Sequence, residues 1–96
     1  MKIKVIGYLK FKALMGDGVS LEIETEEATL RDALNVLSNQ YGKSFENMLF
    51  DPLTKEIKRS NLILLNGQPY INLGKRLDSE LNDGDEITFC PALAGG

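Results

Sequence analysis

The chain has 96 residues, of which 43% are hydrophobic and 26% charged, and its formal net charge is −3. This length predicts one domain, and the composition is ordinary for a globular chain that buries a core without disulfides or metal ions. The acidic balance argues against nucleic acid as a direct partner. No apolar run approaches a membrane span, and the first residues alternate rather than form a secretory signal, so we expect a cytoplasmic protein.

The missing residue types narrow the chemistry that the side chains could perform. The sequence has no His and a single Cys, so it offers no imidazole base, no internal disulfide and no thiolate metal cluster. It also contains neither a Walker-type phosphate loop nor a GxGxxG motif. We therefore expect no metal site and no cofactor bound by this chain, and catalysis by its own side chains is disfavoured.

Two strands are predicted at the start of the chain. Polar and apolar residues alternate over residues 2–8 and again over residues 19–25, which is typical of half-buried strands. The mixed segment between them ends at Gly16-Asp17-Gly18, a turn signal. We expect the two strands to pair in antiparallel orientation.

A main helix and a second short helix are predicted next. Thr29 with Asp32 three residues later resembles a capping box, and apolar residues recur at helical spacing until Gly42, a typical C-terminal stop. Ser44 is a candidate N-cap for a short helix that the Asp51-Pro52 step ends.

The second half of the chain predicts three more strands. Residues 62–65 form a continuous apolar run, which favours a central strand buried on both faces. Asn66-Gly67 is the strongest hairpin signal in the chain, and residues 68–71 would return as an edge strand because Pro69 cannot donate to a ladder. After an Asn-Asp-Gly-Asp turn, residues 86–90 predict the final strand.

This order of elements predicts an α+β fold in two layers. One main helix would cover one face of a mixed sheet of about five strands, with the first and last strands parallel at its centre. Residues 1–90 would form the domain, and residues 91–96 a flexible tail that ends in diglycine. Because glycine lacks Cβ, such a tail can pass through a narrow channel, so we interpret the Gly96 carboxylate as the functional group. An ordinary chain end is the alternative.

The C-terminal region resembles a known family. Residues 81–86 read Leu-Asn-Asp-Gly-Asp-Glu, a hydrophobic strand follows, and Pro91 leads to Gly95-Gly96. This pattern is similar to the ubiquitin-like β-grasp sulfur carriers of the MoaD and ThiS type, closest to the small subunit of molybdopterin synthase. That family typically has Pro-Pro-Val where residues 91–93 read Pro-Ala-Leu, so one proline is missing. Residues 45–61 are also longer than in the shortest members.

The resemblance implies a carrier function and a set of partners. A ThiF/MoeB-type adenylating enzyme would use ATP and Mg to activate Gly96, and a sulfur donor would convert the acyl-adenylate into a thiocarboxylate. A MoaE-like large subunit of molybdopterin synthase would then direct this sulfur to a pterin precursor in molybdenum cofactor biosynthesis. Gly96 and Gly95 would carry the chemistry, while the chain itself supplies no catalytic side chain.

Strand parity predicts where a partner would dock. If Ile87 and Phe89 face the core, the alternate residues of that strand face outward, and exposed apolar residues on an open sheet face mark a partner site. Cys90 is interpreted there as a small contact residue rather than as a reactive thiol. The predicted partner-binding residues are Ile6, Tyr8, Tyr70, Thr88, Cys90, Pro91 and Leu93.

Other functions remain open on sequence grounds. A carrier of this kind could serve tRNA thiolation or covalent tagging of proteins, or thiazole synthesis for thiamine. A different class is a non-covalent ubiquitin-like binding module with an unmodified end. The acidic residues Asp83, Asp85 and Glu86 could be read as catalytic carboxylates, but turn formation explains them better.

Overall fold

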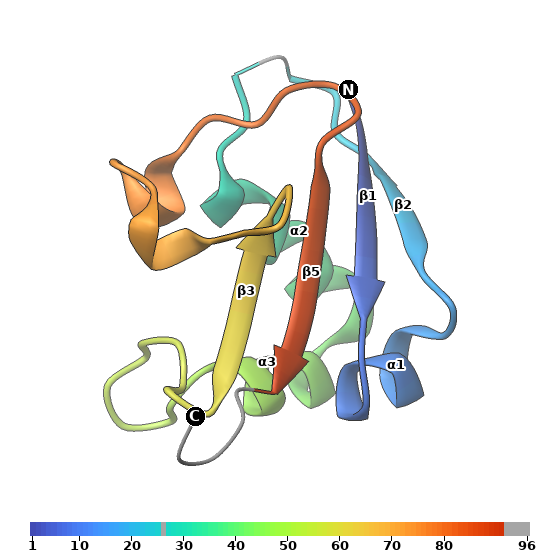
Figure 1. Cartoon of the computed structure of the whole chain (residues 1–96). Helices are drawn as coiled ribbons and strands as arrows, with labels where there is room; N and C mark the ends of the chain where they lie inside the picture. Colours follow the sequence, from blue (N-terminus) through green and yellow to red (C-terminus); the bar gives the residue numbers. More distant parts are fainter. Residues whose placement is uncertain (26, 92–96) are drawn as a thin grey trace.

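The computed structural model describes residues 1–25 and 27–91. Five strands form one mixed sheet in the order β2-β1-β5-β3-β4, and α2 and α3 lie behind it in the view of Figure 1. None of the helices in the described ranges is long and apolar enough to cross a bilayer. In chain order the elements are β1 (Lys2–Gly7), α1 (Lys10–Met15), β2 (Val19–Glu22), α2 (Leu30–Tyr41), α3 (Lys43–Leu49), β3 (Asn61–Leu65), β4 (Gln68–Pro69), the 3₁₀ turns η1 (Tyr70–Asn72) and η2 (Arg76–Asp78), and β5 (Glu86–Pro91).

β5 is the middle strand of the sheet, and β1 lies beside it and runs parallel to it (Figure 1). β1 also pairs with β2 in antiparallel orientation, so the predicted antiparallel pair and the predicted parallel pairing of the first and last strands are both confirmed. β5 continues through Pro91, one residue beyond the predicted strand, and Pro91 lies opposite Asn61 of β3. The predicted two-layer α+β class is therefore correct.

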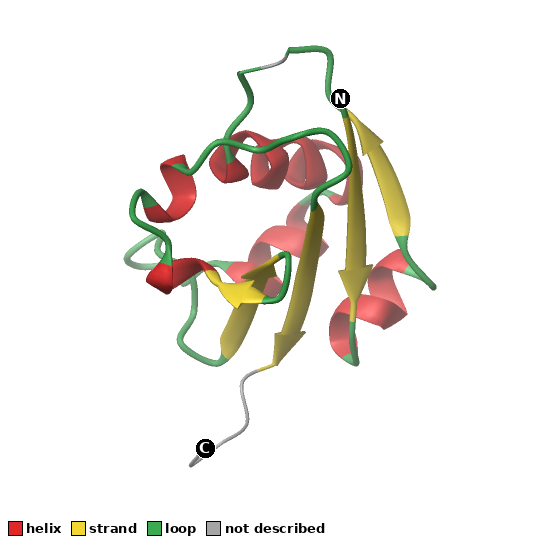
Figure 2. Ribbon diagram, turned by 45° about the horizontal axis from the view of Figure 1, so that its top comes forward, coloured by secondary structure: helices red, strands yellow, loops and turns green. Residues whose placement is uncertain are grey.

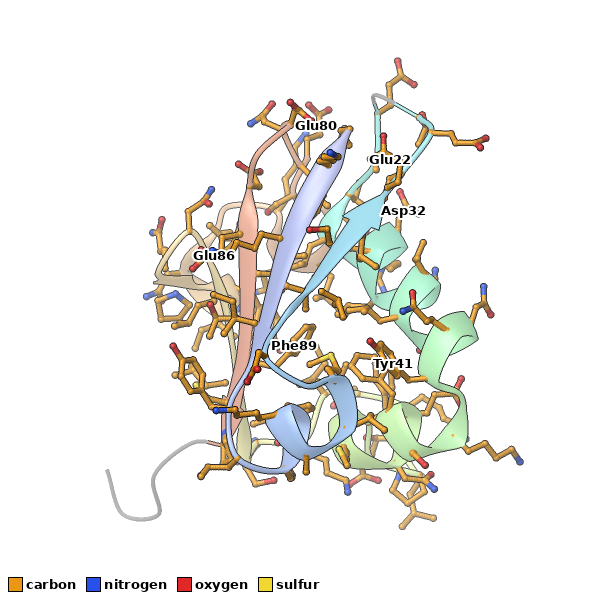
Figure 3. The ribbon with its side chains drawn as sticks, turned by 90° about the vertical axis from the view of Figure 1, so that its right-hand side faces the viewer. Glu22, Asp32, Tyr41, Glu80, Glu86 and Phe89 are labelled. Carbon is orange, nitrogen blue, oxygen red and sulfur yellow. The ribbon has the colours of Figure 1, made fainter. Side chains whose placement is uncertain are left out.

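Alternation along the central strands separates the two faces of the sheet. Ile3 and Val5 of β1 are fully buried, as are Ile87 and Phe89 of β5, while the residues between them face away from the helices. The Phe89 ring lies 5.5 Å from the Phe11 ring and 5.6 Å from the Phe45 ring, measured between centroids. The core therefore fills the space between the sheet and the helices, and Figure 3 shows Tyr41 on the helix side and Glu86 on the open side.

The start of α2 confirms the predicted capping box. The Thr29 hydroxyl accepts a hydrogen bond from the Asp32 backbone N–H at 3.3 Å, and the Asp32 carboxylate accepts one from the Thr29 N–H at 2.9 Å. Gly42 ends the helix at φ 68°, a backbone angle that favours glycine. The predicted Ser44 cap is wrong, because α3 begins at Lys43 and Gly42 itself is the N-cap.

The helix α1 was not predicted. Its sequence, Lys-Phe-Lys-Ala-Leu-Met, buries Phe11 and Met15, which are four residues apart and so share one helical face. Gly7 precedes it in a tight place: a Cβ built there would lie 2.6 Å from Met15 Cε and 2.8 Å from Phe11 Cβ. The absence of a side chain at Gly7 thus lets α1 pack directly against the end of β1.

The prediction that β3 is an interior strand is confirmed, because it lies between β5 and β4. The prediction that it is buried on both faces is wrong, because Ile63 and Leu65 are buried and Leu62 and Leu64 are half-exposed. The Asn66-Gly67 hairpin is confirmed, with both residues at positive φ. The predicted edge strand over 68–71 is shortened to β4 because η1 begins at Tyr70, as Figure 2 shows.

Candidate functional site

The sheet face opposite the helices, called here the outer face, carries rows of side chains that run across the strands. Ile6 lies opposite Thr88, Thr88 lies opposite Leu64, and Leu64 lies opposite Pro69. The next row towards the end of β5 contains Cys90 and Leu62. Because residues in register point to the same side, the first row forms a strip of surface across β1, β5, β3 and β4, and the second row continues it across β5 and β3.

The rows change from charged to apolar along β5. At its beginning Lys4 lies opposite Glu86, with Lys4 Nζ 3.9 Å from the Glu86 carboxylate. The following rows are almost entirely apolar, and Tyr8 joins their end because its N–H donates to the Phe89 carbonyl at 2.9 Å. The apolar part of the outer face therefore lies beside Pro91, the last described residue before the diglycine segment.

The exposure of these side chains fits a docking surface. Ile6, Cys90 and Pro91 are half-buried, whereas 51% of Tyr8 is exposed. Thr88 is on the predicted face but only 8% exposed, since Ile6 and Leu64 flank it, so it offers little area for contact. Exposed apolar surface of this kind, open at the side of a sheet, is typical of a protein interaction site.

The remaining predicted residues lie at the margin or outside the described ranges. Tyr70 is half-buried at the start of η1, next to Pro69 in the first apolar row, and so lies at the edge of the outer face. Leu93, Gly95 and Gly96 fall outside residues 1–25 and 27–91. Their predicted roles as contact and reaction residues stay predictions.

The sequence analysis missed two apolar residues of this surface, Leu62 and Leu64, and the exposed Leu9 that follows Tyr8 in the chain. Leu62 and Leu64 were interpreted as doubly buried, yet both are half-exposed on the outer face. Leu9 follows Tyr8 and is 73% exposed, at φ 54°. If alternation had been assumed over residues 61–65, with Asn61, Ile63 and Leu65 on the buried face, Leu62 and Leu64 would have been placed on the other face.

Cys90 has the properties of a contact residue. It is the free cysteine of this chain and is partly buried, and this burial raises the pKa of its thiol above the ordinary value. A raised pKa keeps the sulfur protonated at neutral pH, and a protonated thiol is a poor nucleophile. The geometry therefore supports the interpretation of Cys90 as an apolar contact.

The acidic residues in the turn before β5 accept hydrogen bonds from backbone N–H groups. Asp83 accepts a hydrogen bond from the Lys2 N–H at 2.6 Å, and Asp85 accepts one from the Asn82 N–H at 2.8 Å. Asp85 also accepts from the Asn66 side-chain amide at 3.0 Å, which joins this turn to the β3–β4 hairpin. These hydrogen bonds support the interpretation of Asp83 and Asp85 as turn residues.

Comparison with known proteins identifies the family. The model of the ThiS family matches residues 10–96. A protein of Archaeoglobus fulgidus named as a candidate sulfur carrier is 32% identical over 76 residues, which cover 79% of this chain and 83% of the relative. The match includes most of the chain, and so it is not limited to a short motif.

Solved structures show the same fold. SAMP1 from Haloferax volcanii superposes with a TM-score of 0.79 over 100% of both chains, at 22% identity. A candidate molybdopterin converting factor, subunit 1, from Pyrococcus furiosus gives a TM-score of 0.74 at 26% identity, over 97% of this chain and 99% of that chain. The architecture is the ubiquitin-like β-grasp fold, and the chain belongs to the ThiS family, the sulfur carriers of the ThiS and MoaD type.

Proposed function

We propose that this carrier is the small subunit of a molybdopterin synthase and delivers sulfur from its C-terminal glycine to a pterin precursor. The observation that carries the proposal is the position of the apolar rows of the outer face, which end beside Pro91, where β5 ends. A partner held on these rows would have residues 92–96 directed into it. Five extended residues reach about 17 Å, far enough to enter an active site.

The chemistry would begin in an adenylating partner of the ThiF/MoeB type. The Gly96 carboxylate would attack the α-phosphorus of ATP, held there with Mg, and pyrophosphate would leave. A hydrosulfide ion supplied by the sulfur donor would then attack the acyl carbon and displace AMP, which leaves a thiocarboxylate. The carrier contributes recognition and delivery, which agrees with the protonated Cys90 thiol and with the structural use of Asp83 and Asp85.

The delivery step would take place on a MoaE-like large subunit. The thiocarboxylate sulfur would form a C–S bond to the pterin precursor there and displace an oxygen substituent from the same carbon, and hydrolysis of the resulting thioester would free the thiol and return the Gly96 carboxylate. Two carrier molecules would supply the two sulfurs of a dithiolene. Gly95 and Gly96 have no Cβ, so the backbone could approach the bound precursor closely. The similarity to the candidate molybdopterin converting factor from Pyrococcus furiosus supports this choice of acceptor.

A second candidate function is sulfur transfer to tRNA or covalent modification of proteins. It is supported by the fold similarity to SAMP1, a small archaeal modifier protein. The carrier chemistry at Gly96 would be the same, and the acceptor would differ. Thiamine thiazole synthesis and a non-covalent binding role remain further alternatives for the same surface.

Intact-mass spectrometry tests the proposal. The chain is co-expressed with an adenylating enzyme and a sulfur donor, and we expect a mass increase equal to the exchange of one oxygen for sulfur. A chain lacking Gly96 is the control and should stay unmodified while it still binds the adenylating enzyme. The purified thiocarboxylate is then mixed with the large subunit and the pterin precursor, and formation of the dithiolene product is measured. Thiocarboxylate formation without this product would favour the second candidate.

A further inference from the structure

A cleft of about 930 Å³ lies on the β3–β4 side of the molecule, away from α1. Its walls come from the segment 55–62, from residues 69–78, which contain η1 and η2, and from Arg31 of α2. In Figure 1 these segments are the loop before β3 and the two orange turns at the left. The cleft has the size of a typical ligand pocket, and the sulfur carrier chemistry does not use it.

Basic side chains are concentrated in this cleft. Six of the eleven Lys and Arg residues line it, against two of the fourteen acidic residues. One of these two, Asp78, pairs with the Arg31 guanidinium at 3.0 Å, and this pair leaves five other basic residues and Glu56 in the lining. The six are Arg31, Lys55, Lys58, Arg59, Lys75 and Arg76. A chain with net charge −3 thus holds a local positive surface that favours an anionic ligand.

The cleft also has an apolar lining. Ile57, Tyr70 and Leu77 are half-buried in it, and Ile71 is 54% exposed at its wall. A simple anion such as phosphate would use the basic side chains alone. A ligand that has carboxylates together with apolar side chains would use both parts of the lining.

The cleft is continuous with the outer face. Leu62 lines the cleft and lies opposite Cys90, and Pro69 lines the cleft and lies opposite Leu64. A protein docked on the apolar rows could therefore extend a segment around β3 into the cleft without leaving the surface. This continuity favours a segment of a protein partner over a separate small molecule.

We propose that the cleft binds an extended, carboxylate-rich segment of a protein that docks on the outer face. The basic residues would pair with its carboxylates, and Tyr70 and Leu77 would contact its apolar side chains. An RNA strand is disfavoured because the chain outside the cleft is acidic and would repel a long polyanion. The inference concerns binding only and does not depend on the chemistry of Gly96.

Titration of the ¹⁵N-labelled protein by NMR tests this inference. The probe is a short synthetic peptide of glutamates around a central Leu-Tyr pair. The control is a peptide in which every glutamate is replaced by glutamine. We expect shifts of amides in segments 55–62 and 69–78 with the glutamate peptide, weakened by added salt, and much smaller shifts with the glutamine peptide. A single-stranded RNA of similar charge is titrated in parallel.

Two charge-reversed variants give the comparison a matched control. Arg59→Glu with Lys75→Glu alters the cleft, and Lys12→Glu with Lys43→Glu makes the same charge change on α1 and α3; all four side chains are exposed. The cleft variant should bind the glutamate peptide roughly tenfold more weakly, and the control variant nearly as well as the unchanged protein. Dispersed amide spectra of both variants verify folding.

Three outcomes of these titrations would overturn the proposal. Equal losses in both variants would reduce the effect to net charge and overturn it, as would the absence of localised shifts. Stronger binding of the RNA than of the glutamate peptide would overturn it in favour of a nucleic-acid site. None of these outcomes depends on thiocarboxylate formation, so failure here is distinguishable from failure of the proposed sulfur transfer.

Discussion

The absence of a Cβ at Gly7 allows α1 to approach the sheet closely. The nearest neighbours of a Cβ at this position include Phe11 carbonyl carbon at 2.9 Å, which is backbone and cannot move aside like a side-chain tip. Both Phe11 and Met15, which surround Gly7, belong to the buried core. The residue is therefore required by packing rather than by backbone angle.

We predict that Gly7→Ala lowers the free energy of unfolding by about 1–3 kcal/mol, because overpacking forces α1 away from β1. Urea unfolding followed by circular dichroism measures the change. Gly74→Ala is the matched control, since a Cβ there meets nothing within 4 Å. A loss at Gly74 as large as the loss at Gly7 would contradict the packing explanation.

Cys90 offers a pH-dependent test at the same scale. Burial raises the pKa of its thiol, so the thiolate fraction of the folded chain at pH 8 is smaller than that of the unfolded chain. We predict that iodoacetamide alkylates Cys90 several-fold more slowly in buffer than in urea. The pH at which the rate increases should be higher for the folded chain than for the unfolded chain. Mass spectrometry follows the reaction. Faster alkylation of the folded chain would indicate an activated thiol instead.

At the level of elements, the two helix starts differ in how they are capped. α2 begins with reciprocal hydrogen bonds between Thr29 and Asp32, whereas α3 begins at Gly42 with no side-chain cap. We predict that Thr29→Ala lowers the free energy of unfolding by about 1 kcal/mol, because the Asp32 backbone N–H loses the hydroxyl that accepts its hydrogen bond. Ser44→Ala should change it by much less. Thermal unfolding of both variants gives the comparison, and equal effects would contradict the capping geometry.

The predictable elements are those whose signals are local. The Thr29 capping box, the Gly42 stop and the Asn66-Gly67 turn each depend on a few adjacent residues, and all three are confirmed. The helix α1 could not be predicted in the same way, because six residues form little helix alone and this one depends on burying Phe11 and Met15. Such burial involves strands that are distant in sequence.

The sequence correctly predicted which face of the sheet the candidate site residues lie on, but it did not predict how exposed each side chain is. Alternation along β5 placed Thr88 and Cys90 on the outer face correctly. The burial of Thr88 is decided by Ile6 and Leu64 on neighbouring strands, and the register that brings them together cannot be read from β5 alone. The apolar run of residues 62–65 led to a wrong prediction of burial, because Leu62 and Leu64 are apolar but half-exposed on the outer face, and their sequence alone does not distinguish them from core residues.

For the molecule as a whole, the order of the strands links the fold to delivery. β5 is the middle strand and pairs with β1 on one side and β3 on the other, and its last residue, Pro91, lies opposite Asn61 of β3. The apolar rows on the same three strands then form a rigid platform beside that end. The order and register of the strands alone therefore place the end of β5 next to the surface that we propose for docking.

The platform yields a prediction on partner binding. Tyr8 is half-exposed at the apolar end of the outer face, and tyrosines in such places contribute strongly to interfaces because they bury a large area. We predict that Tyr8→Ala weakens binding of the adenylating enzyme by roughly tenfold, or about 1–2 kcal/mol, with little effect on folding. Leu53→Ala, at a residue 91% exposed on the loop before β3, is the control. Calorimetric titration should separate the two variants; equal affinities would mean that the enzyme recognises a surface other than the outer face.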